Sequence, residues 1–218
     1  MINILYLVFA YLLGSIPFGF LITHFSTKKN ILKIGWEKTS GSNVFKNIGK
    51  WQGILTGLLD AAKGFIAVWL AQKIGLSPEI QALSGVAAVC GHNWSCFLKF
   101  AGGRGIGTFL GAALALSPGI LGFSLIPLVL LALVWNASIG TILLLITALL
   151  LSIYFGQLES MGIFTIVCLL PIFIKRLSPL KDISFKNRAL IKNRLIFDNN
   201  QPCLELRIKR IFNRLTRE

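Results

Sequence analysis

The sequence predicts an all-α, polytopic membrane protein with about seven transmembrane helices, and three observations support this fold class. The chain has 218 residues, of which 55% are hydrophobic and only 14% are charged, whereas soluble domains carry about 25% charged residues. Its mean hydropathy is +0.74. Its apolar residues form long runs, and a membrane-crossing helix needs about 20 such residues in succession.

The apolar runs define the expected helices in order along the chain. We expect helices at residues 4–25, 51–71, 78–98, 105–116, 118–135, 137–155 and 161–174. The first run has no basic segment before it and no small-residue cleavage site, so it is interpreted as a span and not as a removable signal. The run 106–135 is too long for one ordinary span. We divide it at Ser117-Pro118-Gly119, because proline removes a backbone donor and glycine adds flexibility.

The distribution of charge predicts the orientation. Six lysines lie between residues 28 and 50, Lys99 and Arg104 lie between the third and fourth runs, and twelve basic residues follow from Lys175 onward. The alternate loops hold only Lys73, with Glu79 and Glu159. The positive-inside rule therefore predicts that the three basic segments are cytosolic, with the N-terminus outside and the C-terminus inside.

This orientation divides the chain into a membrane domain, residues 1–175, and a basic cytosolic tail, residues 176–218. Within the tail, segments 193–196 and 206–215 have the composition of basic amphipathic helices that lie on anionic headgroups. A partner-binding role for the tail is the alternative interpretation.

The net charge of +14 indicates which partners the protein binds. Because the charge lies on loops and a tail beside membrane spans, it favours anionic membrane lipids and phosphorylated substrates over nucleic acid. Cysteines stand at positions 90, 96, 168 and 203, with no CxxC pair and no supporting histidine cluster. We therefore expect no metal, no disulfide framework and no cofactor.

The segment Gly102-Gly-Arg-Gly-Ile-Gly-Thr108 precedes an apolar helix and has the features of a phosphate site. Glycines let backbone N–H groups face a ligand, a helix start adds unpaired donors, and an arginine offers a two-pronged contact to phosphate oxygens. The predicted phosphate-binding residues are Gly102, Gly103, Arg104, Gly105 and Thr108. The segment lacks the Gly-Lys-Ser/Thr ending of a Walker A loop and the preceding strand of a Rossmann turn. Close helix packing is the alternative role for its glycines.

Four further polar residues lie in or at the ends of apolar helices. His92 and Asn93 form the polar end of the third run, where a histidine is also found in purely structural roles. Asp60 and Lys63 are three residues apart on one helix face, and we interpret them as a structural ion pair that neutralises itself.

The stretch Gly91-His-Asn-Trp-Ser-Cys-Phe-Leu-Lys-Phe-Ala-Gly-Gly-Arg-Gly-Ile-Gly-Thr108 resembles the acyl-phosphate-dependent glycerol-3-phosphate acyltransferases of bacteria, whose pattern is close to GHNxxxFLxFKGGKGVAT. Residues 11–19 and 59–64 resemble that family's first and second helices, and the resemblance covers residues 5–175 in order. It implies a seven-helix fold in the bacterial cytoplasmic (inner) membrane. It also implies transfer of a fatty acyl group from acyl phosphate to the 1-hydroxyl of glycerol 3-phosphate, giving lysophosphatidic acid for phospholipid biosynthesis.

The resemblance also implies roles for individual residues. His92 and Ser42 are the expected catalytic residues, with His92 as a proton acceptor. The expected substrate contacts are Asn43, Lys46, Asn93 and Ser138.

The chain departs from the family pattern at several places. Trp36 replaces a serine, Lys38 an asparagine and Arg104 a lysine, and the family's last motif after helix seven is not clear. Two outcomes are open for Trp36. Its ring lies on the headgroup layer while Ser40 or Ser42 approaches the substrate, or it fills the acceptor pocket and leaves a binder without turnover. The retained Asn43 and Lys46 favour the first.

Three alternative functions follow from the same residues. One is an acyltransferase with another phosphorylated acceptor. Another is a non-catalytic protein that binds acyl phosphate or anionic lipid. A small transporter is disfavoured, because the charge gathers at one face and not at mid-membrane.

Overall fold

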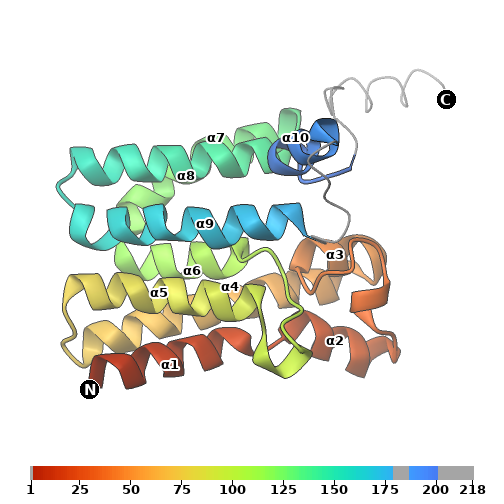
Figure 1. Cartoon of the computed structure of the whole chain (residues 1–218), viewed down its shortest axis with the longest axis horizontal. Coiled ribbons are helices and arrows are strands. Elements are labelled where there is room, and N and C mark those ends of the chain that lie inside the picture. The colour runs from red at the N-terminus through yellow and green to blue at the C-terminus, as the bar shows by residue number, and fades with distance from the viewer. Residues whose placement is uncertain (1, 179–186, 201–218) are drawn as a thin grey trace.

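The computed structural model describes residues 2–178 and 187–200, and these residues form an elongated bundle of α-helices (Figure 1). The helices are α1 (Ile2–Ser15), α2 (Phe18–Thr27), α3 (Gly41–Asn47), α4 (Lys50–Lys73), α5 (Pro78–Asn93), α6 (Ile106–Leu116), α7 (Pro118–Val134), α8 (Ala137–Tyr154), α9 (Ile163–Leu177) and α10 (Arg188–Phe197). A π-helical turn, Leu158–Gly162, leads into α9. The expected all-α class is confirmed.

The core of the bundle forms where α5, α6, α8 and α9 meet. Phe109 of α6 and Phe164 of α9 are fully buried there, with stacked rings whose centroids are 4.7 Å apart. Val68 of α4 and Ile120 and Leu121 of α7 also belong to this core. Among the helix pairs, α1 packs against α5, α4 against α6, and α7 against α8. Small residues permit these close approaches: a Cβ on Gly64 or Gly111 would overlap backbone atoms of the facing helix. Part of the glycine content therefore serves helix packing.

Four segments are long and apolar enough to cross a membrane: residues 2–27, Lys50–Lys73, Ala137–Tyr154 and Leu158–Leu177. Helices α6 and α7 are apolar but shorter. The total of seven spans and the orientation remain predictions.

Two of the expected helices are interrupted by the local sequence. The run 4–25 divides into α1 and α2 at Ile16 and Pro17, because proline lacks an N–H and disfavours helical backbone in the residue before it. The freed carbonyl of Ile16 accepts a hydrogen bond from Lys63 Nζ at 2.9 Å. The run 78–98 ends as a helix at Asn93, and Lys99 and Phe100 then adopt left-handed backbone with φ of 51° and 62°.

The basic segments gather at one end of the bundle. Figure 1 places α2, α3, the loop before α6, and α10 together there, while the loops after α4 and α8 lie at the opposite end. Segment 193–196, expected to be helical, lies within α10, whereas segment 206–215 lies outside the described residues. Helix α10 packs against α8 and α9, so residues 188–197 of the tail lie against the bundle.

Candidate functional site

The glycine loop lies against the end of α5. The Gly103 N–H donates to the His92 carbonyl at 3.0 Å, and the Thr39 N–H donates to the Gly102 carbonyl at 3.4 Å. A Cβ on Gly102 would overlap the His92 and Asn93 carbonyl oxygens, and a Cβ on Gly103 would overlap the His92 ring. These two glycines are buried, and the structure gives them the close-packing role that was the alternative interpretation of the loop.

The loop ends at the start of α6. Gly105 precedes this helix with a φ of 78°, which glycine adopts without strain. The first N–H groups of α6 have no acceptor within the helix, and Ile106 and Gly107 line a cavity. Thr108 lies one residue further and is fully buried, away from the cavity. The helix start can therefore offer backbone donors to an anion.

A cavity of about 1020 Å³ opens at this end of the bundle. It brings together six of the residues expected at the site: Ser42, Lys46, His92, Arg104, Gly105 and Ser138. The other five expected residues, Asn43, Asn93, Gly102, Gly103 and Thr108, are buried and do not line it. Leu128, Ile172 and Ile54 give the cavity an apolar wall beside its polar residues. Such a mixed lining fits a substrate with a charged head and an apolar chain.

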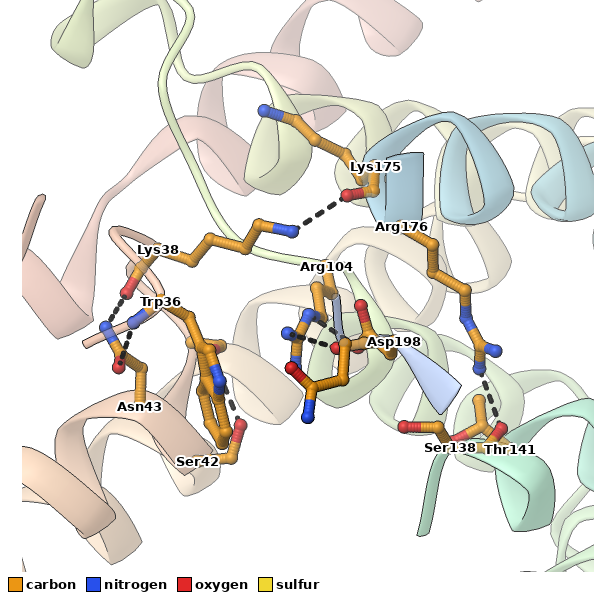
Figure 2. Close-up of polar contacts among 12 residues, drawn as sticks. Trp36, Lys38, Ser42, Asn43, Arg104, Ser138, Thr141, Lys175, Arg176 and Asp198 are labelled. Atoms are coloured by element: carbon orange, nitrogen blue, oxygen red, sulfur yellow. Dashed lines mark hydrogen bonds and ion pairs between the residues drawn. The ribbon is translucent and has the colours of Figure 1, made fainter. Parts of the chain in front are cut away.

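Arg104 lies at the centre of the polar residues (Figure 2). Its guanidinium carbon is 4.9 Å from the centroid of the Trp36 ring, and its Nε is 2.6 Å from Asp198 Oδ2. Burial lowers the pKa of the Arg104 guanidinium, while the Asp198 carboxylate acts in the opposite direction. A largely buried arginine in a cavity wall is suited to binding phosphate.

His92 forms a pair with Asp60 below the loop. His92 Nδ1 is 3.3 Å from Asp60 Oδ1, and Lys63 Nζ is 3.0 Å from the same oxygen. The expected ion pair of Asp60 with Lys63 is present, and the same carboxylate also contacts His92; both Asp60 and His92 line the cavity. A carboxylate beside one ring nitrogen orients a histidine and stabilises its protonated form.

The first loop is organised by Asn43, which is fully buried. Its Nδ2 donates to the Lys38 carbonyl at 2.8 Å and the Ile34 carbonyl at 3.0 Å, and its Oδ1 accepts from the Trp36 N–H at 3.0 Å. The structure thus gives Asn43 contacts within the loop, and its expected contact with substrate remains a prediction. Asn93 is likewise buried, where it donates to the Pro171 carbonyl at 3.0 Å.

Trp36 lies in the cavity wall, and two cations lie near its ring. Lys46 Nζ is 5.3 Å from the ring centroid, and Arg104 is the second cation. Trp36 itself lines the cavity, and which of the two expected outcomes holds for its ring stays a prediction. Ser40 and Ser42 line the same cavity, as the first of those outcomes expected. Figure 2 shows Ser42 beside the indole.

Lys38, which replaces a family asparagine, is buried and reaches α9. Its Nζ donates to the Lys175 carbonyl at 2.9 Å. Burial, with the nearby charge of Arg104, lowers the pKa of Lys38 to about 8.

Arg176 connects three helices at the far side of the cavity. Its guanidinium donates to the Ser138 carbonyl at 2.9 Å and to the Leu195 carbonyl at 2.8 Å. It thus holds the start of α8 and the helix α10 against the end of α9. Ser138 and Thr141 line the cavity next to it.

Sequence reasoning missed three residues of this site: Asp60 as a partner of His92, Arg176, and Asp198. Asp60 lies within a motif that resembles the family, and this was the signal available for it. No pattern in the sequence distinguishes Arg176 and Asp198 from the other charges of the tail. Among the described residues, no cluster of His, Cys, Asp or Glu could hold a metal ion.

The chain matches the family model for glycerol-3-phosphate acyltransferase over residues 4–184. It is similar to a glycerol-3-phosphate acyltransferase of Endomicrobium trichonymphae, with 34% identity over 83% of this chain and 92% of that protein. It is also similar to a glycerol-3-phosphate acyltransferase of Syntrophomonas wolfei, with 36% identity over 76% of this chain and 74% of that protein. A relative from Prochlorococcus marinus strain MIT 9312 is 40% identical, but the match spans 53% of this chain and only 58% of that protein.

Two solved structures share the fold. The crystal structure of PlsY, an integral membrane glycerol 3-phosphate acyltransferase, in its glycerol 3-phosphate form has a TM-score of 0.74 and 28% identity. Its lysophosphatidic acid form has a TM-score of 0.70 and 30% identity. Each match covers 83% of this chain and 91% of the other.

Proposed function

The chain belongs to the glycerol-3-phosphate acyltransferase family, and from this premise we propose that it transfers a fatty acyl group to the 1-hydroxyl of glycerol 3-phosphate. The product is lysophosphatidic acid, an intermediate of phospholipid synthesis. We further propose that the donor is acyl phosphate and that the reaction takes place at the cytosolic face of the bacterial inner membrane. The observation that carries the proposal is the single cavity that joins Arg104, Lys46, Ser42 and His92.

Both proposed substrates carry phosphate, and the cavity supplies cations for them. Arg104 binds the phosphate of glycerol 3-phosphate, and the N–H groups at the start of α6 face the phosphate of the donor. Lys46 and Arg176 approach from the other walls. The acyl chain lies along the apolar wall around Leu128 and Ile172. Held together in this way, the two reactants gain from proximity and orientation.

The proposed chemistry is an acyl transfer. The 1-hydroxyl oxygen of glycerol 3-phosphate attacks the acyl carbonyl carbon and forms the new ester bond. The bond between that carbon and the phosphate oxygen breaks, and inorganic phosphate leaves with the bonding electrons. His92, held by Asp60, accepts the hydroxyl proton, and Ser42 donates a hydrogen bond to a substrate oxygen. The N–H groups at the start of α6 stabilise the charge that develops on the leaving phosphate.

The test is an assay of the purified protein with palmitoyl phosphate and labelled glycerol 3-phosphate. Labelled lysophosphatidic acid is the expected product, and palmitoyl-coenzyme A in place of palmitoyl phosphate should give none. Product with the coenzyme A ester but not with the phosphate would contradict the proposed donor. Binding of both substrates without product would instead identify a binding protein.

A further inference from the structure

Asp198, the residue after the last turn of α10, brings a carboxylate into the cavity wall. Its Oδ2 is 2.6 Å from Arg104 Nε, and 7% of its side chain is exposed. Its Oδ1 is buried and has no hydrogen-bond partner in the part of the chain that the structure describes. Figure 2 shows this carboxylate between Arg104 and the start of α8.

An unpaired carboxylate oxygen is unusual at such a position. Buried polar atoms almost always have a partner, and a missing partner costs stability, more so when the group is charged. The three cations nearest to Asp198 attract the carboxylate, but none of them makes a hydrogen bond to Oδ1. The cavity therefore presents a strong acceptor that lacks a donor.

The position of Asp198 is built by specific contacts. Its N–H donates to the Arg194 carbonyl at 3.0 Å, and its backbone is left-handed with a φ of 52°. Arg194 donates in turn to the Leu177 carbonyl at 2.9 Å, and Arg176 donates to the Leu195 carbonyl. Two arginines thus hold the end of α10 against α9.

We propose that Asp198 is a specificity-determining residue that accepts a hydrogen bond from the 2-hydroxyl of glycerol 3-phosphate through Oδ1. This inference rests on the proposed function. The geometry favours the 2-hydroxyl because Asp198 touches Arg104. When the substrate phosphate binds Arg104, the nearest hydroxyl is the one on the carbon next to the phosphate-bearing carbon. The 1-hydroxyl lies further along the molecule and is free to approach His92.

The test compares two acceptors, glycerol 3-phosphate and 3-hydroxypropyl phosphate, which lacks only the 2-hydroxyl. The wild-type protein should prefer glycerol 3-phosphate in kcat/KM by about ten- to a hundredfold, which is the usual effect of one hydrogen bond to a charged group. In Asp198→Ala, the kcat/KM values for the two acceptors should lie within a few-fold of each other. Asp198→Asn, which keeps an acceptor oxygen without the charge, should give an intermediate preference.

Glu37→Gln is the matched control, since it removes one negative charge from an exposed side chain at the same end of the bundle. It should leave the preference as in the wild type. If Asp198→Ala lowers kcat/KM equally for both acceptors, Asp198 only positions Arg104. If it raises kcat/KM equally for both, Asp198 only competes with the substrate phosphate for Arg104. Either result would overturn the inference.

Binding of both acceptors, measured by calorimetry on the same variants, separates this inference from the proposed function. If the wild type shows no turnover, the proposed enzyme activity fails, and the ratio of the two dissociation constants still decides the role of Asp198. A ratio of dissociation constants near one in the wild type would contradict the proposed role of Asp198. So would a ratio that stays the same in Asp198→Ala.

Discussion

The substitution Gly103→Ala tests whether the glycine loop and His92 act as one unit. A Cβ at this position would overlap His92 Nε2 and would lie 2.8 Å from Cε1 and 3.0 Å from Cδ2, closer than side chains pack. The ring has little room to yield, because His92 is 5% exposed and its Nδ1 faces Asp60. Either the ring or the loop must therefore move.

The size of this movement sets the expected effect. The overlap requires a shift of about 1 Å, and a misplacement of that size costs about a hundredfold in rate when a catalytic group is involved. This equals about 3 kcal/mol of transition-state stabilisation. We expect kcat/KM for acyl transfer to fall by about that factor in Gly103→Ala. Gly122→Ala, where a Cβ meets nothing within 4 Å, should retain the wild-type rate.

A double-mutant cycle with His92→Ala shows whether the effect passes through the histidine. Removing the ring leaves space for the new Cβ, so adding Gly103→Ala to His92→Ala should cost little further activity. If the loss of kcat/KM in the double variant equals the product of the two single losses, the effect of Gly103→Ala does not pass through His92. A single Gly103→Ala variant with wild-type kcat/KM would also refute the argument.

Four further predictions address the cations, the aromatic wall and the topology. Arg104→Ala should weaken glycerol 3-phosphate binding by about ten- to a hundredfold, and Arg104→Lys by less, because lysine keeps the charge without the two-pronged contact. An alanine variant that binds glycerol 3-phosphate as tightly as the wild type would place the phosphate elsewhere. Trp36→Ala should weaken the same binding by about two- to fivefold through loss of its stacking on Arg104, and calorimetry that finds no change would exclude this role. The lowered pKa of Lys38, about 8 in the folded protein, means that the unfolded chain binds more protons between pH 8 and the ordinary lysine value of 10.5. Stability in detergent should therefore rise with pH across that window, and the rise should be smaller in Lys38→Met. Parallel curves of Tm against pH for the two proteins would contradict this prediction. A cysteine at position 33 should resist a membrane-impermeant reagent added outside intact cells, whereas labelling there would reverse the proposed topology.

The sequence by itself determined the helical membrane class and most helix boundaries. Apolar runs longer than a turn or two report local burial, and Pro118 marks an interruption because its missing N–H acts within a few residues. The break at Pro17 was not predicted, and only the structure showed that the first run divides there. Charge bias also placed the basic segments together, since every such segment is excluded from the bilayer for the same reason. The glycine loop with Arg104 was recognisable because its donors and charge are contiguous in the chain.

Only the tertiary structure decided how these residues meet. Glycine spacing alone does not distinguish a phosphate cradle from close packing, and the structure places Gly102 and Gly103 against α5 while Gly105 and Arg104 line the cavity. Asp198 and Arg104 are 94 residues apart in the chain. Periodicity and composition describe residues that are neighbours in sequence. The ion pair of Asp198 with Arg104 and the contact of Asp60 with His92 depend instead on which helix faces pack together, and side-chain packing across the whole bundle determines those faces.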